Sequence, residues 1–355
     1  MTVTAEKLAA LKSLDKRDPI EMADPRLIVS QMRRLEKTNV PLTAPPYFGI
    51  STFLKAPLVR SLQCVDIAMV GVPCDLGVTN RPGARFGPQQ VRQMSCIAGG
   101  PMHHALGIVP DSLCEIVDFG DVPITDQYTL DRAIEEIHAF YTYLIGNHVT
   151  PLSVGGDHSV TYPILKALGK QRPLGLVHID AHCDTGPEMN GTKFHHGGPF
   201  RNAALDGVID TERTIQIGIR GRAEPLWNFS RDSGMTVLHI EDVYEMGLAA
   251  VIQKARDIVS TGPIYVSIDV DGIDPAFTPG TGTPEIGGLL PREVQQIIRG
   301  LRGLDIVGAD VVEVSPPYDP SGNTALVAAT MLWELLCVTS EAVAARKLSK
   351  NTDTK

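Results

Sequence analysis

The stretch Leu174-Gly175-Leu176-Val177-His178-Ile179-Asp180-Ala181-His182-Cys183-Asp184 decides how this chain folds. Its first six residues form a short, nearly continuous apolar run, which is typical of a parallel strand covered on both faces. Asp180, His182 and Asp184 follow at a spacing of two. An extended backbone points residues i, i+2 and i+4 to the same side. We therefore expect a buried strand that delivers two carboxylates and one imidazole to one place.

Seven further apolar runs of this kind occur along the chain. They span residues 66–72, 114–118, 150–154, 214–219, 236–240, 263–268 and 306–313. Helical periodicity fills many of the gaps, most clearly over 129–146, 159–169, 241–260, 291–301 and 323–346. Alternating strands and helices predict right-handed crossovers and one twisted, largely parallel sheet of an α/β protein.

The sequence outside these elements indicates one catalytic domain with two appendages. Residues 61–346 contain one set of alternating elements, without a repeat or a low-complexity linker. Residues 1–60 have a different character, with a helix near 4–14 and a proline-rich stretch, and we expect an arm lying on the domain or on a neighbouring subunit. The polar segment 347–355 is expected to be a disordered tail.

Composition excludes several classes of protein. No apolar run approaches the ~20 residues of a membrane span, and the first ten residues lack the pattern of a signal peptide. The six cysteines show no paired spacing, so reduced thiols in a cytoplasmic enzyme are expected. A net charge of −9 without a basic block excludes a nucleic-acid partner and is consistent with a small cationic substrate.

Three other apolar runs end in side chains of the same chemistry. The relevant stretches are Gly155-Gly156-Asp157-His158-Ser159, Ser267-Ile268-Asp269-Val270-Asp271 and Val312-Glu313-Val314-Ser315-Pro316. In open α/β sheets, ligands bind outside the carboxyl ends of the strands, where all these residues fall. So many carboxylates need counter-charge, and the pattern predicts a hydrolase with a pair of divalent ions. Carboxylates suit Mn or Mg, while imidazoles extend the range to Mn, Fe, Co, Ni or Zn. By contrast, Asp157 and Asp274 are predicted only to cap turns.

The motifs together resemble the arginase/agmatinase (ureohydrolase) family. They are Gly-Gly-Asp-His-Ser, Ile-Asp-Ala-His-Cys-Asp and Ser-Ile-Asp-Val-Asp-Gly-Ile-Asp-Pro, with Arg81-Pro82-Gly83-Ala84-Arg85-Phe86-Gly87-Pro88 and Gly282-Thr283-Pro284. The resemblance covers roughly residues 45–340 and is strongest to the guanidinobutyrase-like branch, which also includes guanidine and biguanide hydrolases. It implies a three-layer α/β/α fold around an eight-stranded parallel sheet, and assembly as homo-trimers or hexamers.

The resemblance also implies which residues hold the two metal ions. His158, Asp180, Asp184 and Asp269 would bind one ion, and Asp180, His182, Asp269 and Asp271 the other. Asp180 and Asp269 would then bridge the two ions. The family usually carries Mn²⁺, and Ni²⁺ is the alternative because some guanidine-hydrolysing relatives prefer it.

The chemistry requires such ions because resonance makes the guanidinium carbon a poor electrophile. A metal-bound water can have its pKa lowered to ~7, which supplies hydroxide at neutral pH. By resemblance, Asp184 orients this bridging hydroxide and passes on its proton, Glu313 grips the guanidinium, and His196 shuttles a proton to the departing amine. The products are urea and an amine. His195 is the competing candidate for the shuttle and is otherwise expected to be a partly exposed residue at the pocket rim.

Departures from the family pattern bear on the substrate. Thr185-Gly186-Pro187-Glu188-Met189-Asn190-Gly191 replaces the Asn-rich loop with which arginases bind an α-amino acid, which argues against L-arginine. We expect 4-guanidinobutyrate or a similar ω-guanidino acid first. Guanidine or a substituted guanidine or biguanide such as metformin comes second, and agmatine third. Asn80 and Cys183 stand at unusual positions and are expected to line the pocket. The candidate partners for a substrate carboxylate are Arg201, Arg220 and Arg222.

Two rival functions follow from other patterns. Gly120-Asp121 and Gly146-Asn147-His148 superficially match a dinuclear phosphoesterase, but Ile124 occupies the position where that class needs an acid. The other rival is a non-catalytic subunit of a hetero-oligomer with a paralogous chain. Such a subunit would have lost metal ligands, and none is lost here, so the chain would be the active member of such a pair.

Overall fold

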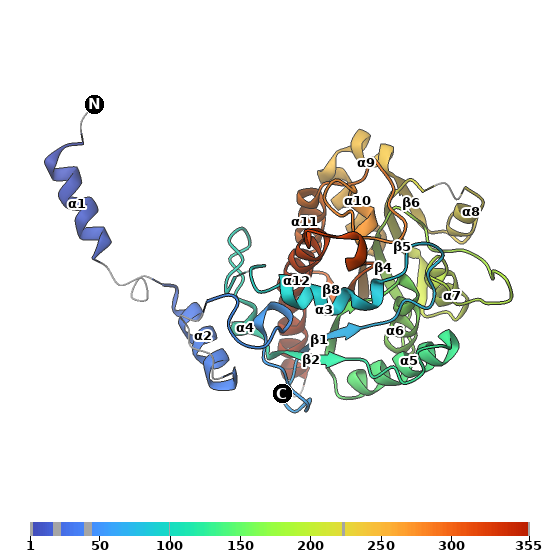
Figure 1. Ribbon diagram of the computed structural model, residues 1–355, viewed down its shortest axis with the longest axis horizontal. Helices are drawn as coiled ribbons and strands as arrows, with labels where there is room; N and C mark the ends of the chain where they lie inside the picture. The colour runs from blue at the N-terminus through green and yellow to red at the C-terminus, as the bar shows by residue number, and fades with distance from the viewer. Residues whose placement is uncertain (1–2, 17–22, 39–44, 99, 222–223, 354–355) are drawn as a thin grey trace.

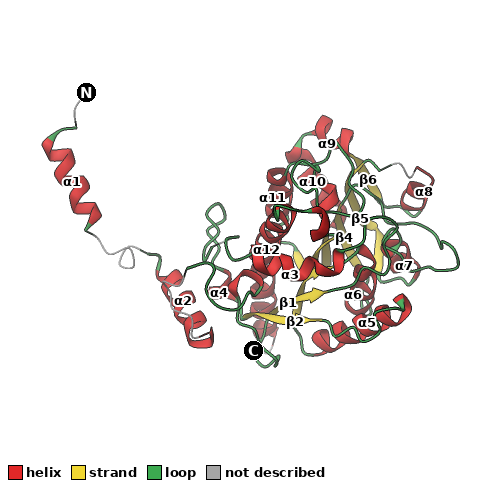
Figure 2. Cartoon of the chain, in the orientation of Figure 1, coloured by secondary structure: helices red, strands yellow, loops and turns green. Residues whose placement is uncertain are grey.

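A computed structural model describes residues 3–16, 23–38, 45–98, 100–221 and 224–353. Its centre is one eight-stranded sheet in the order β2-β1-β3-β8-β7-β4-β5-β6, and every neighbouring pair is parallel (Figure 2). The strands are β1 (Ile67–Val72), β2 (Ile116–Asp121), β3 (Thr150–Gly155), β4 (Leu174–Ile179), β5 (Ile209–Ile219), β6 (Thr236–His239), β7 (Pro263–Asp269) and β8 (Asp305–Val312). The predicted parallel sheet is confirmed.

Helices cover both faces of this sheet, so the fold has the three predicted layers (Figure 1). The helices α3 (Gly87–Met94), α10 (Leu248–Val259), α11 (Pro291–Gly300) and α12 (Asn323–Asp353) pack on one face. The opposite face carries α5 (Leu130–Gly146), α6 (Thr161–Leu168) and α7 (Pro199–Leu205). The others are α1 (Ala5–Asp15), α2 (Pro25–Thr38), α4 (Pro110–Leu113), α8 (Glu224–Asp232) and α9 (Ile240–Met246).

Most strands, β1 among them, contribute to two apolar cores because successive side chains point to opposite faces. In β1, Ile67 and Met69 join the core under α12, whereas Ala68 and Val70 join the core under α5 and α6. All four are fully buried. Burying one large aliphatic side chain contributes about 1.5–3 kcal/mol, so both cores stabilise the sheet. This double coverage explains why the strands are apolar runs rather than alternating ones.

Two predicted elements differ from the structure. The helix expected over 241–260 is divided into α9 and α10 at Gly247, whose φ of 75° ends the first helix. The helix expected over 323–346 continues to Asp353, so 347–353 is helical rather than the disordered tail that we expected. Contacts with the residues at the beginning of β8 and β1 account for this. Arg346 donates to the carbonyl of Ile306 (2.9 Å), and Lys347 pairs with Asp66 (2.8 Å).

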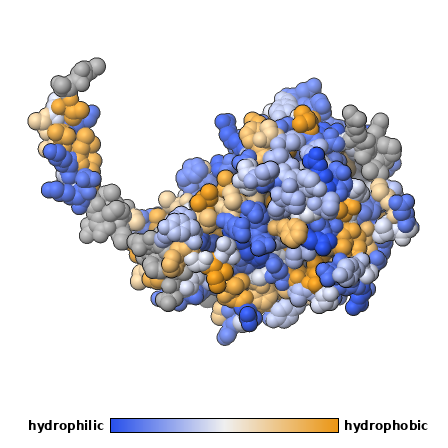
Figure 3. All heavy atoms as spheres, in the orientation of Figure 1, coloured by the Kyte–Doolittle hydropathy of each residue, from blue (hydrophilic) through white to orange (hydrophobic). Residues whose placement is uncertain are grey.

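The described part of the amino-terminal arm begins with α1 and α2, of which only α2 is tied to the domain, and it ends in the core, where Phe53 and Leu54 are buried. Arg34 pairs with Asp111 (2.7 Å), to which the Ser30 hydroxyl also donates (2.9 Å). The helix predicted near 4–14 is α1, which has no buried residue and stands away from the domain (Figure 1). Apolar side chains are visible on its surface (Figure 3). Residues 39–44, which include the first part of the proline-rich stretch, lie outside the described residues.

Two composition-based expectations can be compared with the structure. All six cysteines are free thiols. The segment Asn323–Lys350 of α12 is long and apolar enough to cross a membrane, but 78% of its apolar 18-residue window is buried inside the protein. Its apolar character is therefore accounted for by the core that it packs into.

Substitution of Gly156 tests the close backbone contact between the segments that follow β1 and β3. A Cβ atom at Gly156 would lie 1.6 Å from the carbonyl oxygen of Cys74, so Gly156→Ala has to push two backbones apart. We expect a Tm lowered by roughly 10 °C or more, or no folded protein. Gly146→Ala is the matched control, because a Cβ atom there meets nothing within 4 Å, and alanine favours a helix. Equal melting temperatures for the two variants, measured by circular dichroism, would contradict this account.

Candidate metal centre

The sequence-predicted ligands come together because their strands are neighbours. The central order β3-β8-β7-β4 brings four carboxyl ends side by side. His158 follows β3, Asp180 follows β4, Asp269 ends β7 and Glu313 follows β8. His158 and Glu313 are 155 positions apart in the chain, yet the backbone N–H of His158 donates to Glu313 Oε1 (2.9 Å). The topology therefore assembles one acidic site from distant segments.

The first cluster forms around the His158 imidazole. Its Nδ1 lies 2.9 Å from Asp184 Oδ2, 3.1 Å from Asp180 Oδ2 and 3.2 Å from Asp269 Oδ2. Two ligands about 2.1 Å from one ion, at right angles to each other, would lie about 3.0 Å apart. The nitrogen and three oxygens are thus spaced as neighbouring ligands of a single divalent ion.

The hydrogen bonds of His158 leave Nδ1 as a lone pair. The other nitrogen, Nε2, lies 2.9 Å from Ser267 Oγ, which itself donates to Asp310 Oδ1 (2.6 Å). The serine oxygen must then accept the hydrogen from Nε2, and Nδ1 has no hydrogen-bond partner. A buried lone pair facing three carboxylates requires a cation, so these residues fit a metal ion. Without an ion a proton takes this place: burial lowers the pKa of His158, but the three carboxylates outweigh burial and raise the pKa well above its usual value.

A second cluster shares one residue with the first. His182 Nδ1 lies 3.2 Å from Asp271 Oδ2 and 3.4 Å from Asp180 Oδ1. Asp180 therefore presents one carboxylate oxygen to each cluster, as a bridging ligand would. Asp269 is placed differently: its Oδ2 faces His158, and its Oδ1 accepts from the backbone N–H of Asp271 (2.7 Å).

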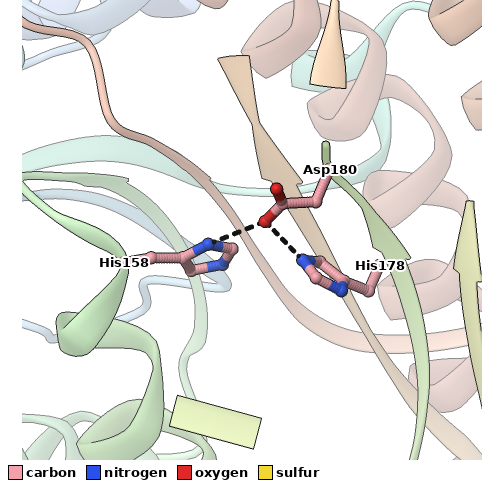
Figure 4. Close-up of side chains that lie close together, drawn as sticks. All are labelled: His158, His178 and Asp180. Carbon is pink, nitrogen blue, oxygen red and sulfur yellow. Dashed lines mark hydrogen bonds and ion pairs between the residues drawn. The ribbon is translucent and has the colours of Figure 1, made fainter. Parts of the chain in front are cut away.

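His178 is a site residue that sequence reasoning missed. Its Nε2 lies 2.7 Å from Asp180 Oδ2, and Figure 4 shows Asp180 between the rings of His158 and His178. Gln216 Nε2 donates to His178 Nδ1 (3.1 Å), so Nε2 carries the hydrogen and donates to the carboxylate. His178 thus orients Asp180 rather than offering a lone pair to an ion. The available signal was its position two residues before Asp180, inside an otherwise apolar strand.

The acidic groups influence each other strongly. Burial and the charges of Asp271 and Asp180 raise the pKa of Asp269 well above its usual value. Burial and Asp180 raise the pKa of Asp271 to about 6. For Asp180, burial would raise the pKa, but His178, His158 and His182 together lower it well below the usual value. A divalent ion at each cluster would remove the repulsion that these shifts express.

Two site residues have strained backbones. Asp184 has a φ of 51° and Glu313 a φ of 66°, in the left-handed region that non-glycine residues rarely adopt. Such strain costs about 1–3 kcal/mol and persists only where surrounding contacts impose it. The Glu313 N–H donates to Gly156 O (2.8 Å), and the Asp184 carbonyl accepts from the Phe200 N–H (3.2 Å). The fold therefore fixes where both carboxylates point.

Glu313 has one free carboxylate oxygen. Its Oε1 accepts from the His158 N–H and lies 2.9 Å from His196 Nδ1. Its Oε2 is buried and has no hydrogen-bond partner among the residues that the structure describes. A Cβ atom at Gly282 would lie 3.4 Å from Oε2, so glycine keeps the space beside this oxygen open. Glu313 can thus accept a hydrogen bond from a bound cation.

The adjacent histidines have different surroundings. His196 Nδ1 faces Glu313, and its Nε2 lies 2.7 Å from Thr79 Oγ1 and accepts from the Thr79 N–H (3.2 Å). Burial lowers the pKa of His196, but Glu313 outweighs it and raises the pKa to about 9. His195 donates through Nε2 to Pro187 O (2.9 Å) and is only 5% exposed. It is therefore buried, not the partly exposed rim residue that we expected.

A cavity of about 140 Å³ opens beside the two clusters. It is lined by Thr79, His182, Cys183, Asp184, Met189, His195, His196, Gly197, Asp269, Asp271 and Thr283. Cys183 lies in this wall as expected, and burial raises the pKa of its thiol to about 12. Asn80 has a different place: its side-chain amide donates to Gly282 O (2.9 Å) and ties two loops together.

The arginines proposed for a substrate carboxylate are engaged elsewhere. Arg201 donates to Thr185 O (3.1 Å) and stacks over Phe229 (4.2 Å). Arg220 donates only to backbone carbonyls, those of Gly218, Asp271, Gly272 and Glu285. Neither lines the cavity. Arg222 lies outside the described residues.

The two aspartates predicted to be caps have that role. Asp157 accepts from the backbone N–H groups of Ser159 (2.9 Å) and Gly77 (2.8 Å). Asp274 accepts from the N–H groups of Ala276, Gly287 and Gly288. Both therefore shape the loops around the site.

Comparisons with known proteins agree with this geometry. Residues 65–337 match the arginase family. The chain is 49% identical to guanidinopropionase of Pseudomonas aeruginosa, with 84% of this chain and 95% of that protein covered. It is 44% identical to guanidinobutyrase of the same organism, with 83% and 93% covered. The structure of proclavaminate amidino hydrolase from Streptomyces clavuligerus superposes with a TM-score of 0.81 at 39% identity, with 84% and 100% covered.

Asp271→Ala tests the second cluster. The change removes one of the four side chains expected to hold the second ion, so we expect one bound divalent ion per chain in the variant and two in the parent protein. Metal content after Mn²⁺ loading and desalting measures this directly. Asp131→Ala, an exposed residue on α5, is the control and should keep both ions. Two ions retained by Asp271→Ala would contradict the assignment.

Proposed function

The chain belongs to the arginase family and is a hydrolase of guanidino C–N bonds, and we propose that it converts a small ω-guanidino acid to urea and an amine. The observation that carries this proposal is the buried, unpartnered Oε2 of Glu313 beside the two clusters. That oxygen suits a guanidinium N–H, because hydrogen bonds between ionised groups are the strong ones. A guanidinium held there lies next to the aspartates and histidines that hold the metal.

The proposed cofactor is two divalent ions per chain, Mn²⁺ first and Ni²⁺ second. His158, Asp180, Asp184 and Asp269 would hold one ion, and Asp180, His182, Asp269 and Asp271 the other. When bound, the ions would lower the pKa of a water and neutralise the aspartates. Hard carboxylate ligands favour Mn²⁺, and the two imidazoles leave Ni²⁺ as an alternative.

Proton movement would depend on Asp184 and His196. Asp184 lies in the cavity wall beside His158, where its carboxylate can orient a water and take its proton. His196 shares Glu313 Oε1 through Nδ1, so one carboxylate links the substrate site to the imidazole. Both nitrogens of His196 have protein partners, and Thr79, whose hydroxyl lies 2.7 Å from Nε2, lines the cavity, so this hydroxyl lies between Nε2 and the substrate site. We propose that this pair delivers the proton to the departing amine.

The relatives favour a guanidino acid as substrate. The names of two of them, guanidinopropionase and guanidinobutyrase, denote action on guanidino acids with short chains. The wall of the cavity favours a second class. Among the described residues that line it, none is lysine or arginine, so the wall offers no ammonium or guanidinium group to a substrate carboxylate. Guanidine, a substituted guanidine or biguanide, or agmatine are therefore the second candidates.

We further propose that the chain acts in the cytoplasm as a homo-trimer or hexamer. Leu8, Leu11 and Leu14 on α1 are each 46–49% exposed, and such apolar surface favours burial against another subunit. A hetero-oligomer with a paralogous chain is the alternative. In that case this chain would be the catalytic member, because all six predicted ligands are present.

Urea release from a panel of compounds tests the proposed function. Protein reconstituted separately with Mn²⁺ and with Ni²⁺ is assayed with 4-guanidinobutyrate, 3-guanidinopropionate, guanidine, metformin, agmatine and L-arginine. Turnover of the first two establishes a guanidino acid hydrolase. Turnover of guanidine, metformin or agmatine alone establishes the second class. No urea from any compound with two ions bound would refute the proposal.

Glu313→Gln tests the guanidinium site. Glutamine keeps the shape but loses the charge, and a hydrogen bond to a charged group contributes about 1.5–3 kcal/mol, so kcat/KM should fall roughly 10–100-fold. Both ions should remain, because Glu313 is not in either cluster. Glu188→Gln, an exposed residue beyond the ligand motif, should leave kcat/KM unchanged. Unaltered kinetics in Glu313→Gln would rule out its role.

A further inference from the structure

A row of buried polar side chains crosses the sheet beneath the metal centre. Register partners on five neighbouring strands run Ser153, Asp310, Ser267, His178 and Gln216, from β3 through β8, β7 and β4 to β5. All five side chains are fully buried. Their neighbours in each strand belong to the core under α12, so the row faces α5, α6 and α7. Five polar residues in one row of a buried sheet need a reason.

Asp310 is the charged member of this row, and it has no cationic partner among the described residues. Its Oδ1 accepts from Ser267 Oγ (2.6 Å), and its Oδ2 accepts from Thr161 Oγ1 (2.6 Å) and from the Tyr265 hydroxyl (2.8 Å). Acceptance from three hydroxyl groups is the pattern of an ionised carboxylate. A buried charge without a counter-ion is strongly unfavourable, so a neutral residue would serve stability better.

Two hydrogen bonds connect Asp310 to His158, the candidate ligand of the first metal ion. Ser267 Oγ donates to Asp310 and therefore accepts from His158 Nε2 at 2.9 Å. This directionality fixes the imidazole as the tautomer whose Nδ1 lone pair faces Asp180, Asp184 and Asp269. We propose that Asp310 is a positioning residue that acts through Ser267 to hold His158 as a ligand for the first metal ion. Its negative charge also makes the imidazole a better donor to that ion.

The other end of the row has a parallel arrangement. Gln216 donates to His178, which donates to the bridging carboxylate of Asp180. Both branches end on a residue of the first cluster, and both fix its orientation through an intermediate side chain. The polar row is therefore a support for the metal centre rather than a set of unrelated core residues.

Manganese binding to the full-length protein tests this proposal without any substrate. Metal-free parent protein, Ser267→Ala, Asp310→Asn and the double variant are titrated with Mn²⁺ by calorimetry, after circular dichroism has shown that each is folded. Loss of an outer partner typically weakens metal binding 10–100-fold, so both single variants should bind one of the two ions that much more weakly. Because the residues act in series, the double variant should resemble the single ones.

Tyr265→Phe is the matched control. It removes another hydroxyl from the same carboxylate and leaves the link to His158 intact, so both Mn²⁺ affinities should stay within about threefold of the parent. Equal weakening by Tyr265→Phe would indicate general loosening of the core and overturn the proposal. Parent-like Mn²⁺ binding by folded Ser267→Ala also overturns it, even if Asp310→Asn does not fold.

This inference goes beyond the proposed function, and the two can fail separately. A parent protein that binds two ions but releases no urea would refute the proposed reaction and leave the Asp310 branch standing. If the parent protein releases urea while Ser267→Ala binds both ions normally, the proposed reaction stands and the role of Asp310 is refuted. A parent that binds no Mn²⁺ would overturn the role of Asp310.

Discussion

Electrostatic repulsion among four aspartates is the constraint on which the rest of the structure depends. Asp180, Asp184, Asp269 and Asp271 meet where four parallel strands end, and the raised pKa values of Asp269 and Asp271 reflect burial first and repulsion from neighbouring carboxylates, Asp180 among them, second. A fold can keep such a site only if cations offset the charge. The lone pair of His158 Nδ1 is directed at the same carboxylates, so we expect the offsetting cation to be a metal ion. A proton takes its place when no ion is bound.

The sheet provides the rigidity that this arrangement needs. Two apolar cores hold the strands in register, and the register places Ser153, Asp310, Ser267, His178 and Gln216 in one buried row. In our proposal that row orients the candidate metal ligands from within the sheet. The strained backbones at Asp184 and Glu313 direct two further carboxylates from the loops that follow the strands. Rigid secondary structure supplies the support, and loops supply the groups that face the substrate.

The acidic centre also explains the choice of substrate class. Glu313 lies beside the clusters and leaves its Oε2 as an open acceptor, which favours a planar cation over an anionic phosphate ester. The phosphoesterase alternative conflicts with this geometry as well as with the family. The remaining specificity depends on the cavity wall, where uncharged residues such as Thr79, Met189 and Thr283 surround a small volume.

The sequence alone predicted the parallel sheet, the eight strands and the candidate metal ligands that the structure brings together, because apolar runs and a spacing of two are local properties of the chain. It did not determine the extent of α12, which depends on contacts of Arg346 and Lys347 with the beginning of β8 and β1, far away in the sequence. Nor did it show that His195 is buried or that Asn80 binds a backbone carbonyl. It also did not show that His178 contacts Asp180, or that Asp310 is linked to His158 through Ser267. Those roles depend on which strands become neighbours and in what register. Only the tertiary structure fixes that, because hydrogen bonds between residues 109 and 155 positions apart arise from the packing of the whole sheet.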